Sequence, residues 1–143
     1  MREILFRAKA INRDSIDGRC RRTDYKNGDW VYGLITKPYN EEYNFPAEMR
    51  NTDGVAGIEV DYKTIGQYTG LTDKNGVKIF EGDIVRLGGA NFPVIFNTLG
   101  ECAEFALTDG VPFGFDYIHV PMEVVGNIYD NPELIGGADD ENS

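Results

Sequence analysis

Apolar and polar residues alternate over many short stretches of this chain, and this period of two is the signature of β-strands with one buried face. In residues 2–11 the alternation places Ile4, Phe6, Ala8 and Ala10 on one side, with charged residues between them. The same reasoning, helped by aromatic and β-branched residues, predicts further strands at residues 30–35, 58–65, 65–71, 78–80, 84–87, 93–96, 103–107, 117–120 and 122–129.

Turn-forming residues separate these stretches. Asn75-Gly76 is among the strongest turn dipeptides because both residues tolerate a positive φ, and further turns are expected at residues 27–29, 81–83 and 88–89. Residues 12–27 are polar and predict a loop, and residues 38–51 predict an irregular segment with at most one helical turn around 46–49. Pro132 follows an N-cap candidate, Asn131, which predicts a short closing helical turn.

The chain has 143 residues, enough for one ordinary domain with a real core. We expect a single β domain over residues 1–135 and an acidic flexible tail over residues 136–143. The Gly-Asp-Ile-Val unit at 82–85 gives a sharp entry into an apolar strand, as strands of small SH3-like barrels often begin. The expected fold is therefore mainly β, with SH3-like barrel character and little helix.

Charge and composition narrow the function. The formal net charge of −10 repels phosphate backbones, so nucleic-acid binding is disfavoured. A basic stretch at residues 19–26 is expected to be a solvated loop. No apolar run approaches 18 residues, which argues against a membrane span. Cys20 and Cys102 have no metal or redox spacing, and we therefore expect a reduced, cytoplasmic protein.

Catalytic residue types are scarce. The single histidine, His119, cannot build a multi-histidine metal site, and Ser15 and Ser143 lie in a polar loop and at the C-terminus. A pair formed by Cys102 and His119 is conceivable, but an ordinary strand cysteine and a half-buried histidine fit these positions better. We expect no catalytic residues, no cofactor and no metal, and we favour a protein that is not an enzyme.

Two groups of side chains leave alternatives open. Glu81 and Asp83 could hold a metal together with Asp73 and support a metal-dependent hydrolase, although any solvated turn offers the same residues. The aromatic residues Trp30, Tyr32, Tyr68 and Phe80 could stack on single-stranded nucleic acid, although core packing or subunit packing suits them better. The candidate interaction surface comprises Trp30, Tyr32, Tyr68, Glu81 and Asp83.

Four segments resemble the signatures of the YopX family of phage and prophage proteins. They are residues 1–8, residues 28–33, the long block 64–76 with its continuation 79–85, and residues 125–134. They occur in family order from residue 1 to about residue 135, and the central block is the most specific. Residues 36–57 and 88–121 match little.

The resemblance implies a protein encoded by a phage or prophage and present in the bacterial cytoplasm, with a mostly β fold and a homo-oligomeric state. It implies no activity, cofactor or catalytic residue. Our leading hypothesis is a non-enzymatic accessory protein that binds protein, either a host factor or a second copy of itself, since aromatic-rich strands occur without a catalytic set.

Overall fold

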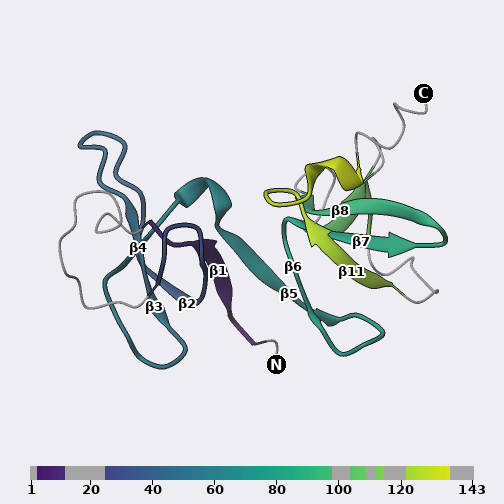
Figure 1. Cartoon of the computed structure of the whole chain (residues 1–143), viewed down its shortest axis with the longest axis horizontal. Helices are drawn as coiled ribbons and strands as arrows, with labels where there is room; N and C mark the ends of the chain where they lie inside the picture. The colour runs from purple at the N-terminus through teal and green to yellow at the C-terminus, as the bar shows by residue number, and fades with distance from the viewer. Residues whose placement is uncertain (1–2, 12–24, 98–103, 109–111, 115–121, 136–143) are drawn as a thin grey trace. The chain divides into compact units, whose positions relative to one another are not determined.

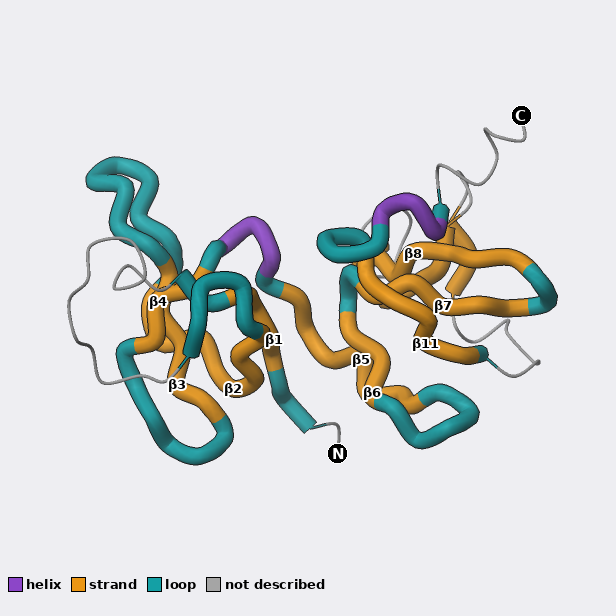
Figure 2. The backbone as a smooth tube through the Cα atoms, viewed as in Figure 1, coloured by secondary structure: helices purple, strands orange, loops and turns teal. Residues whose placement is uncertain are grey.

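The computed structural model describes residues 3–11, 25–97, 104–108, 112–114 and 122–135. The chain forms two compact units, residues 1–67 and residues 68–143, and each is described by itself. Strands dominate both units, and the helical segments described are two short 3-10 helices (Figure 1, Figure 2). The predicted mainly β fold with little helix is confirmed. The single domain over residues 1–135 stays a prediction, and residues 136–143 lie outside the described residues.

The first unit is an antiparallel sheet in the order β4-β3-β2-β1-β5. A 3-10 helix, η1, connects β4 to β5, and β5 continues into the second unit, where it pairs with β6. The bounds are β1 Phe6–Lys9, β2 Trp30–Lys37, β3 Ala47–Asn51, β4 Ile58–Val60, η1 Tyr62–Thr64 and β5 Gly66–Thr72.

The strand ladders form two antiparallel sheets and no closed barrel over the described residues, so the predicted SH3-like barrel character is not confirmed. Beyond the ladders, an isolated bridge joins Ala10, just after β1, to Val60 of β4. Ile11 N–H donates to the Glu59 carbonyl at 2.8 Å, and Asp61 N–H donates to the Lys9 carbonyl at 2.8 Å. The outer side of β4 is therefore hydrogen-bonded to the chain that follows β1.

The core of the first unit forms where alternate residues of its strands face inward. Ala8, Val31, Met49 and Val60 are each fully buried. The alternation expected at residues 2–11 is present in part, because Ala8 and Ala10 are buried but Ile4 is 65% exposed. Strand β1 accordingly begins only at Phe6.

Strand β3 corrects the expectation that residues 38–51 are irregular. Ala47 and Met49 are completely buried, while Arg50 is exposed, which is the alternation of a strand. The sequence signal is weak because the strand has only two apolar positions, and alanine and methionine have little intrinsic preference for strands. Pairing with β2 and β4 decides the conformation instead.

Gly33 allows β2 and β3 to approach closely. A Cβ atom at this position would lie 1.9 Å from the Arg50 carbonyl oxygen, well inside van der Waals contact. Gly33 is paired with Asn51 across the ladder. Only glycine fits this contact without a shift of the backbone.

The second unit contains a sheet in the order β10-β9-β8-β7-β11, with Ile79, Val85 and Val94 in its core. The predicted strands at 78–80, 84–87, 93–96, 103–107 and 122–129 are confirmed within a few residues, and β10 was not predicted. The expected strand at 117–120 lies outside the described residues, as do Cys20, Cys102 and His119. The bounds are β6 Lys78–Phe80, β7 Asp83–Leu87, β8 Ala90–Asn97, β9 Glu104–Thr108, β10 Pro112–Gly114, β11 Glu123–Asn127 and η3 Pro132–Leu134.

Candidate functional site

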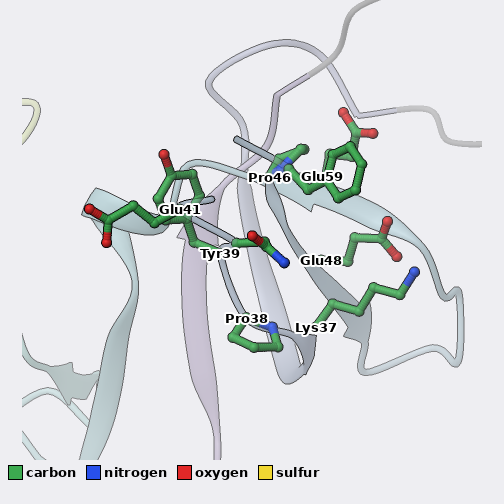
Figure 3. Close-up of a pocket in the computed structure, with 9 residues that line it drawn as sticks. Lys37, Pro38, Tyr39, Glu41, Pro46, Glu48 and Glu59 are labelled. Atoms are coloured by element: carbon green, nitrogen blue, oxygen red, sulfur yellow. The ribbon is translucent and has the colours of Figure 1, made fainter. Parts of the chain in front are cut away.

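The first unit carries a surface groove made of two adjoining cavities, of about 680 Å³ and about 380 Å³. Tyr39 and Pro46 line both cavities, so together they form one feature, which we call the aromatic groove. The larger cavity is lined by the β2–β3 loop and by residues of the adjoining strands, among them Glu59 of β4 (Figure 3). The smaller cavity is lined in part by Tyr62 and Lys63 of η1. The lining residues are Ile11, Lys37, Pro38, Tyr39, Asn40, Glu41, Asn44, Phe45, Pro46, Glu48, Glu59, Val60, Asp61, Tyr62 and Lys63.

The β2–β3 loop is shaped by its own hydrogen bonds. Asn40 and Phe45 exchange two backbone hydrogen bonds, of 3.0 and 3.1 Å, which close the loop as a small hairpin. The Asn40 side chain accepts from Tyr43 N–H at 3.1 Å, and the Tyr39 hydroxyl donates to Asn44 Oδ1 at 2.9 Å. Asn44 has a φ of 56°, a left-handed conformation that asparagine tolerates better than most residues. Four hydrogen bonds within the loop therefore stabilise this conformation.

The opposite wall is fixed by η1. Asp61 caps this helix, since its Oδ1 accepts from Lys63 N–H at 3.0 Å. Buried Thr64 donates from its hydroxyl to the Asp61 carbonyl at 2.7 Å and accepts from Lys9 N–H at 2.8 Å. These contacts present Tyr62, 42% exposed, where it stacks on Tyr39 with ring centres 4.0 Å apart and planes 9° from parallel.

The groove combines exposed aromatic surface with acidic groups. Phe45 is 61% exposed at its rim, and Tyr43, 62% exposed, stacks beside Phe45 at 5.8 Å. In the view of Figure 3, Glu48, Glu59 and Lys37 lie in one group, and Glu41 lies apart from them with its carboxylate directed away from the group. Three glutamates and one lysine are therefore among the described residues that line the larger cavity.

The predicted interaction residues of the first unit lie on the other side of β2 from its core-facing Val31. Tyr32 is 38% exposed, and Trp30 is half-buried. The Arg7 guanidinium lies 4.5 Å and the Lys9 ammonium 5.4 Å from the centre of the Trp30 ring. Two cations of the chain itself therefore approach Trp30, where the stacking hypothesis requires a nucleic-acid base.

The predicted aromatic residues of the second unit are inside it. Tyr68 and Phe80 are 7% and 3% exposed and pack with ring centres 5.6 Å apart, on paired positions of β5 and β6. The Lys78 ammonium lies 5.5 Å from the Tyr68 ring. Their packing agrees with the core interpretation and leaves these rings little surface for stacking on bases.

Asp83 is used by the turn that precedes β7. It is 2% exposed, and its Oδ2 accepts from Phe80 N–H at 2.7 Å. Gly82, beside it, has a φ of 93°, the left-handed conformation that favours glycine. Glu81 is half-buried at the same turn. The turn predicted at 81–83 is confirmed, and the Asp83 carboxylate serves the backbone.

Asp73 is likewise occupied by backbone amides. Its Oδ1 accepts from Asn75 and Val77 N–H at 2.8 and 2.9 Å, and its Oδ2 accepts from Val124 N–H at 2.9 Å. Burial raises the pKa of Asp73, but these three hydrogen bonds and the charge of Lys74 outweigh burial and hold the pKa below its ordinary value. Asp73 thus ties the β5–β6 turn to β11.

The hydrolase alternative gains no geometric support from these placements. Within the described ranges, no group of three or more His, Cys, Asp or Glu side chains could hold a metal ion. The carboxylates of Asp73 and Asp83 already accept backbone hydrogen bonds.

No helix in the described part of the chain is long and apolar enough to cross a membrane.

The aromatic groove was not predicted from the sequence, because residues 38–51 were expected to be irregular. A signal was present: Pro38 to Pro46 contains Tyr39, Tyr43 and Phe45. Three aromatic residues between two prolines in a short connection are unusual for a solvated loop and are typical of a recognition surface. The partner of Tyr39, Tyr62, could not be found from local sequence because it lies in η1.

Comparison with known proteins identifies the family of this chain and a solved structure with a similar fold. The model of the YopX protein family matches residues 19–136. The crystal structure of protein EF1440 from Enterococcus faecalis superposes with a TM-score of 0.51 at 21% identity, covering 94% of this chain and 99% of that one. This likeness shows a shared fold. No curated protein matches. Because the family model spans most of the sequence, the chain belongs to the YopX family.

Proposed function

We propose that this protein is a phage or prophage accessory protein that acts in the bacterial cytoplasm by binding protein, without catalysing a reaction. The aromatic groove of the first unit carries the proposal. It presents Tyr39, Phe45 and Tyr62 on a scaffold fixed by hydrogen bonds. Surfaces of this kind, rich in exposed aromatic side chains and preorganised, are typical of protein recognition.

The partner is a host protein or a second copy of the chain. Exposed aromatic side chains are the residues that contribute most binding free energy when a partner buries them. Tyr62 and Phe45 are 42% and 61% exposed, so burial under a partner would remove a large apolar area from water. The groove is therefore expected to be the dominant contact.

The test is capture of partners from a bacterial lysate by the tagged full-length chain, compared between three forms. Tyr62→Ala truncates the groove, and Tyr32→Ala truncates a tyrosine of similar exposure, 38%, outside the residues that line it. We expect a protein that the unaltered chain and Tyr32→Ala retain and that Tyr62→Ala loses. Circular dichroism checks that both variants fold.

Retention of the same proteins by Tyr62→Ala would refute the groove as the binding surface. Loss with Tyr32→Ala alone would instead support the predicted surface around Trp30 and Tyr32. Light scattering on the purified chain separates the two kinds of partner. A dimer that Tyr62→Ala dissociates would identify a second copy as the partner.

A further inference from the structure

The aromatic groove also constrains what its partner looks like. The three modes by which proteins commonly bind a peptide segment are addition of a strand to a sheet edge, docking of a helix in a groove, and docking of an extended proline-containing segment on aromatic side chains. Each mode needs a different surface. The contacts of β4 and the composition of the groove distinguish between them.

Strand addition needs an edge with free backbone groups, and β4 does not offer one beside the groove. Its Glu59 carbonyl already accepts from Ile11 N–H, and Asp61 N–H donates to the Lys9 carbonyl. These bonds occupy the outer side of the short strand Ile58–Val60. A segment bound in the groove must therefore be recognised through its side chains.

The groove suits an extended segment that contains proline. Its apolar surface consists of the rings of Tyr39, Tyr62 and Phe45 with Pro38 and Pro46, split between two adjoining hollows. A polyproline II segment has no internal hydrogen bonds to maintain and is already ordered, so it loses little conformational entropy on binding aromatic side chains. A helix would instead need a continuous apolar trough, and carboxylates interrupt this groove.

The charges select basic side chains in that segment. Among the described residues, the larger cavity is lined by three glutamates, Glu41, Glu48 and Glu59, and by one lysine, Lys37. The whole chain carries a formal charge of −10, which disfavours a second copy as the occupant. Guanidinium groups both pair with carboxylates and stack on aromatic rings, so arginine matches the groove better than lysine.

We infer that the aromatic groove binds an extended, proline-containing and arginine-containing segment of another protein. The inference rests on the proposed function and specifies the partner of that same site. Prolines contact Tyr39, Tyr62 and Phe45, and arginine pairs with glutamates among the residues that line the larger cavity, Glu48 and Glu41. Affinity therefore depends both on the aromatic side chains and, in a salt-dependent manner, on the carboxylates.

The experiment uses three libraries of short synthetic peptides on an array, with the full-length chain as the probe. The first fixes two spaced prolines and two arginines, the second replaces the prolines with alanine, and the third replaces the arginines with glutamate. All other positions are random. Fluorescence anisotropy of the best peptides then gives dissociation constants at low and physiological salt. We expect binding from the first library and about tenfold or greater weakening in the other two, which corresponds to about 1.4 kcal/mol.

Charge variants of the protein supply a matched control. Glu41→Gln with Glu48→Gln removes two carboxylates of the cavity, and Glu42→Gln removes a neighbouring exposed carboxylate that does not line it. We expect the double variant to weaken the arginine peptides severalfold and to flatten their salt dependence, while Glu42→Gln leaves both unchanged. Equal effects of the two would refute charge selection by the groove.

Two other outcomes overturn the inference and leave the proposed function standing, and a third overturns both. Peptides from the second or third library that bind as tightly as the first, with loss on Tyr62→Ala, would show a groove without this preference. No binding from any library, beside a lysate partner that Tyr62→Ala loses, would show recognition of a folded surface. Tighter binding of single-stranded oligonucleotides than of any peptide would contradict both proposals.

Discussion

Tyr39 and Tyr62 stack face to face, with ring centres 4.0 Å apart and planes 9° from parallel, and they join the β2–β3 loop to η1. Tyr39 also packs against the core of the first unit. The stack therefore connects the core of the unit to its surface groove.

The first prediction concerns the contribution of the Tyr39 hydroxyl to stability, apart from that of the Tyr39 ring. Tyr39→Phe keeps the stack on Tyr62 but removes the hydrogen bond to Asn44 Oδ1. We expect the free energy of unfolding to fall by about 0.5–1.5 kcal/mol, near the lower end because the hydrogen bond is exposed. Urea unfolding, followed by the fluorescence of Trp30 in the same unit, measures it. Tyr43→Phe, at a 62% exposed residue, is the control and should change nothing.

The second prediction concerns the backbone at Asn44, whose φ is 56°. Glycine adopts a left-handed conformation without strain. Asn44→Gly therefore leaves the backbone unstrained but removes the acceptor of the Tyr39 hydroxyl. Asn44→Ala removes that acceptor and adds strain of about 1–2 kcal/mol. We expect Asn44→Ala to be the less stable of the two in thermal unfolding. Equal stabilities would show that the loop adopts another backbone conformation.

The third prediction is a pH dependence in the second unit. The pKa of Asp73 lies below the ordinary aspartate value of 3.8, so ionised Asp73 stabilises the fold above that pH. This stabilisation is lost as the pH falls from there through the lowered folded-state pKa. Asp73→Asn should lower the free energy of unfolding by roughly 1–3 kcal/mol near neutral pH, because one or more part-buried backbone amides lose a charged acceptor.

Hydrogen exchange of the Val77 and Val124 amides, measured from pH 6 down to pH 2, checks this prediction. In the unaltered chain protection should fall with acid, and in Asp73→Asn it should start low and depend less on pH. Asp53→Asn is the control because it removes an exposed carboxylate in the β3–β4 loop and none of these bonds. If protection of these amides falls with acid in Asp73→Asn as it does in the unaltered chain, Asp73 is not the source of the pH dependence.

The fourth prediction concerns the close approach of β2 and β3. A Cβ at Gly33 would lie 1.9 Å from the Arg50 carbonyl oxygen, so Gly33→Ala must push the strands apart. We expect the free energy of unfolding to fall by at least about 1–3 kcal/mol, as at other overpacked sites. Leu34→Ala, at a neighbouring residue that is 49% exposed, should cost much less. Denaturant titration monitored by Trp30 fluorescence compares them, and equal losses would contradict the contact.

Local signals in the sequence were sufficient to predict many of the strands and turns. Asn75-Gly76 predicted the turn between β5 and β6, and the apolar residues that follow predicted β6 at Lys78–Phe80. The same signals failed for β3, where burial of Ala47 and Met49 is decided by pairing with β2 and β4. Propensity describes one segment at a time, whereas that strand is stabilised by its neighbours.

The candidate site was harder to predict than the strands. Trp30 and Asp83 were singled out by residue type, but their roles depend on partners that type does not reveal: Arg7 and Lys9 around Trp30, and Phe80 N–H at Asp83. The aromatic groove arises only when η1 brings Tyr62 against Tyr39. Such a site needs tertiary contacts between segments that share no local pattern.

The bond between Asp73 and Val124 N–H has a consequence for the order of events in folding. It joins residues 51 positions apart, so it forms only after a long stretch of chain has been brought together. A contact of this kind is expected to be largely unformed in the folding transition state. The Asp73–Val124 bond should therefore influence how slowly the second unit opens once folded, and have little influence on how fast the unit forms.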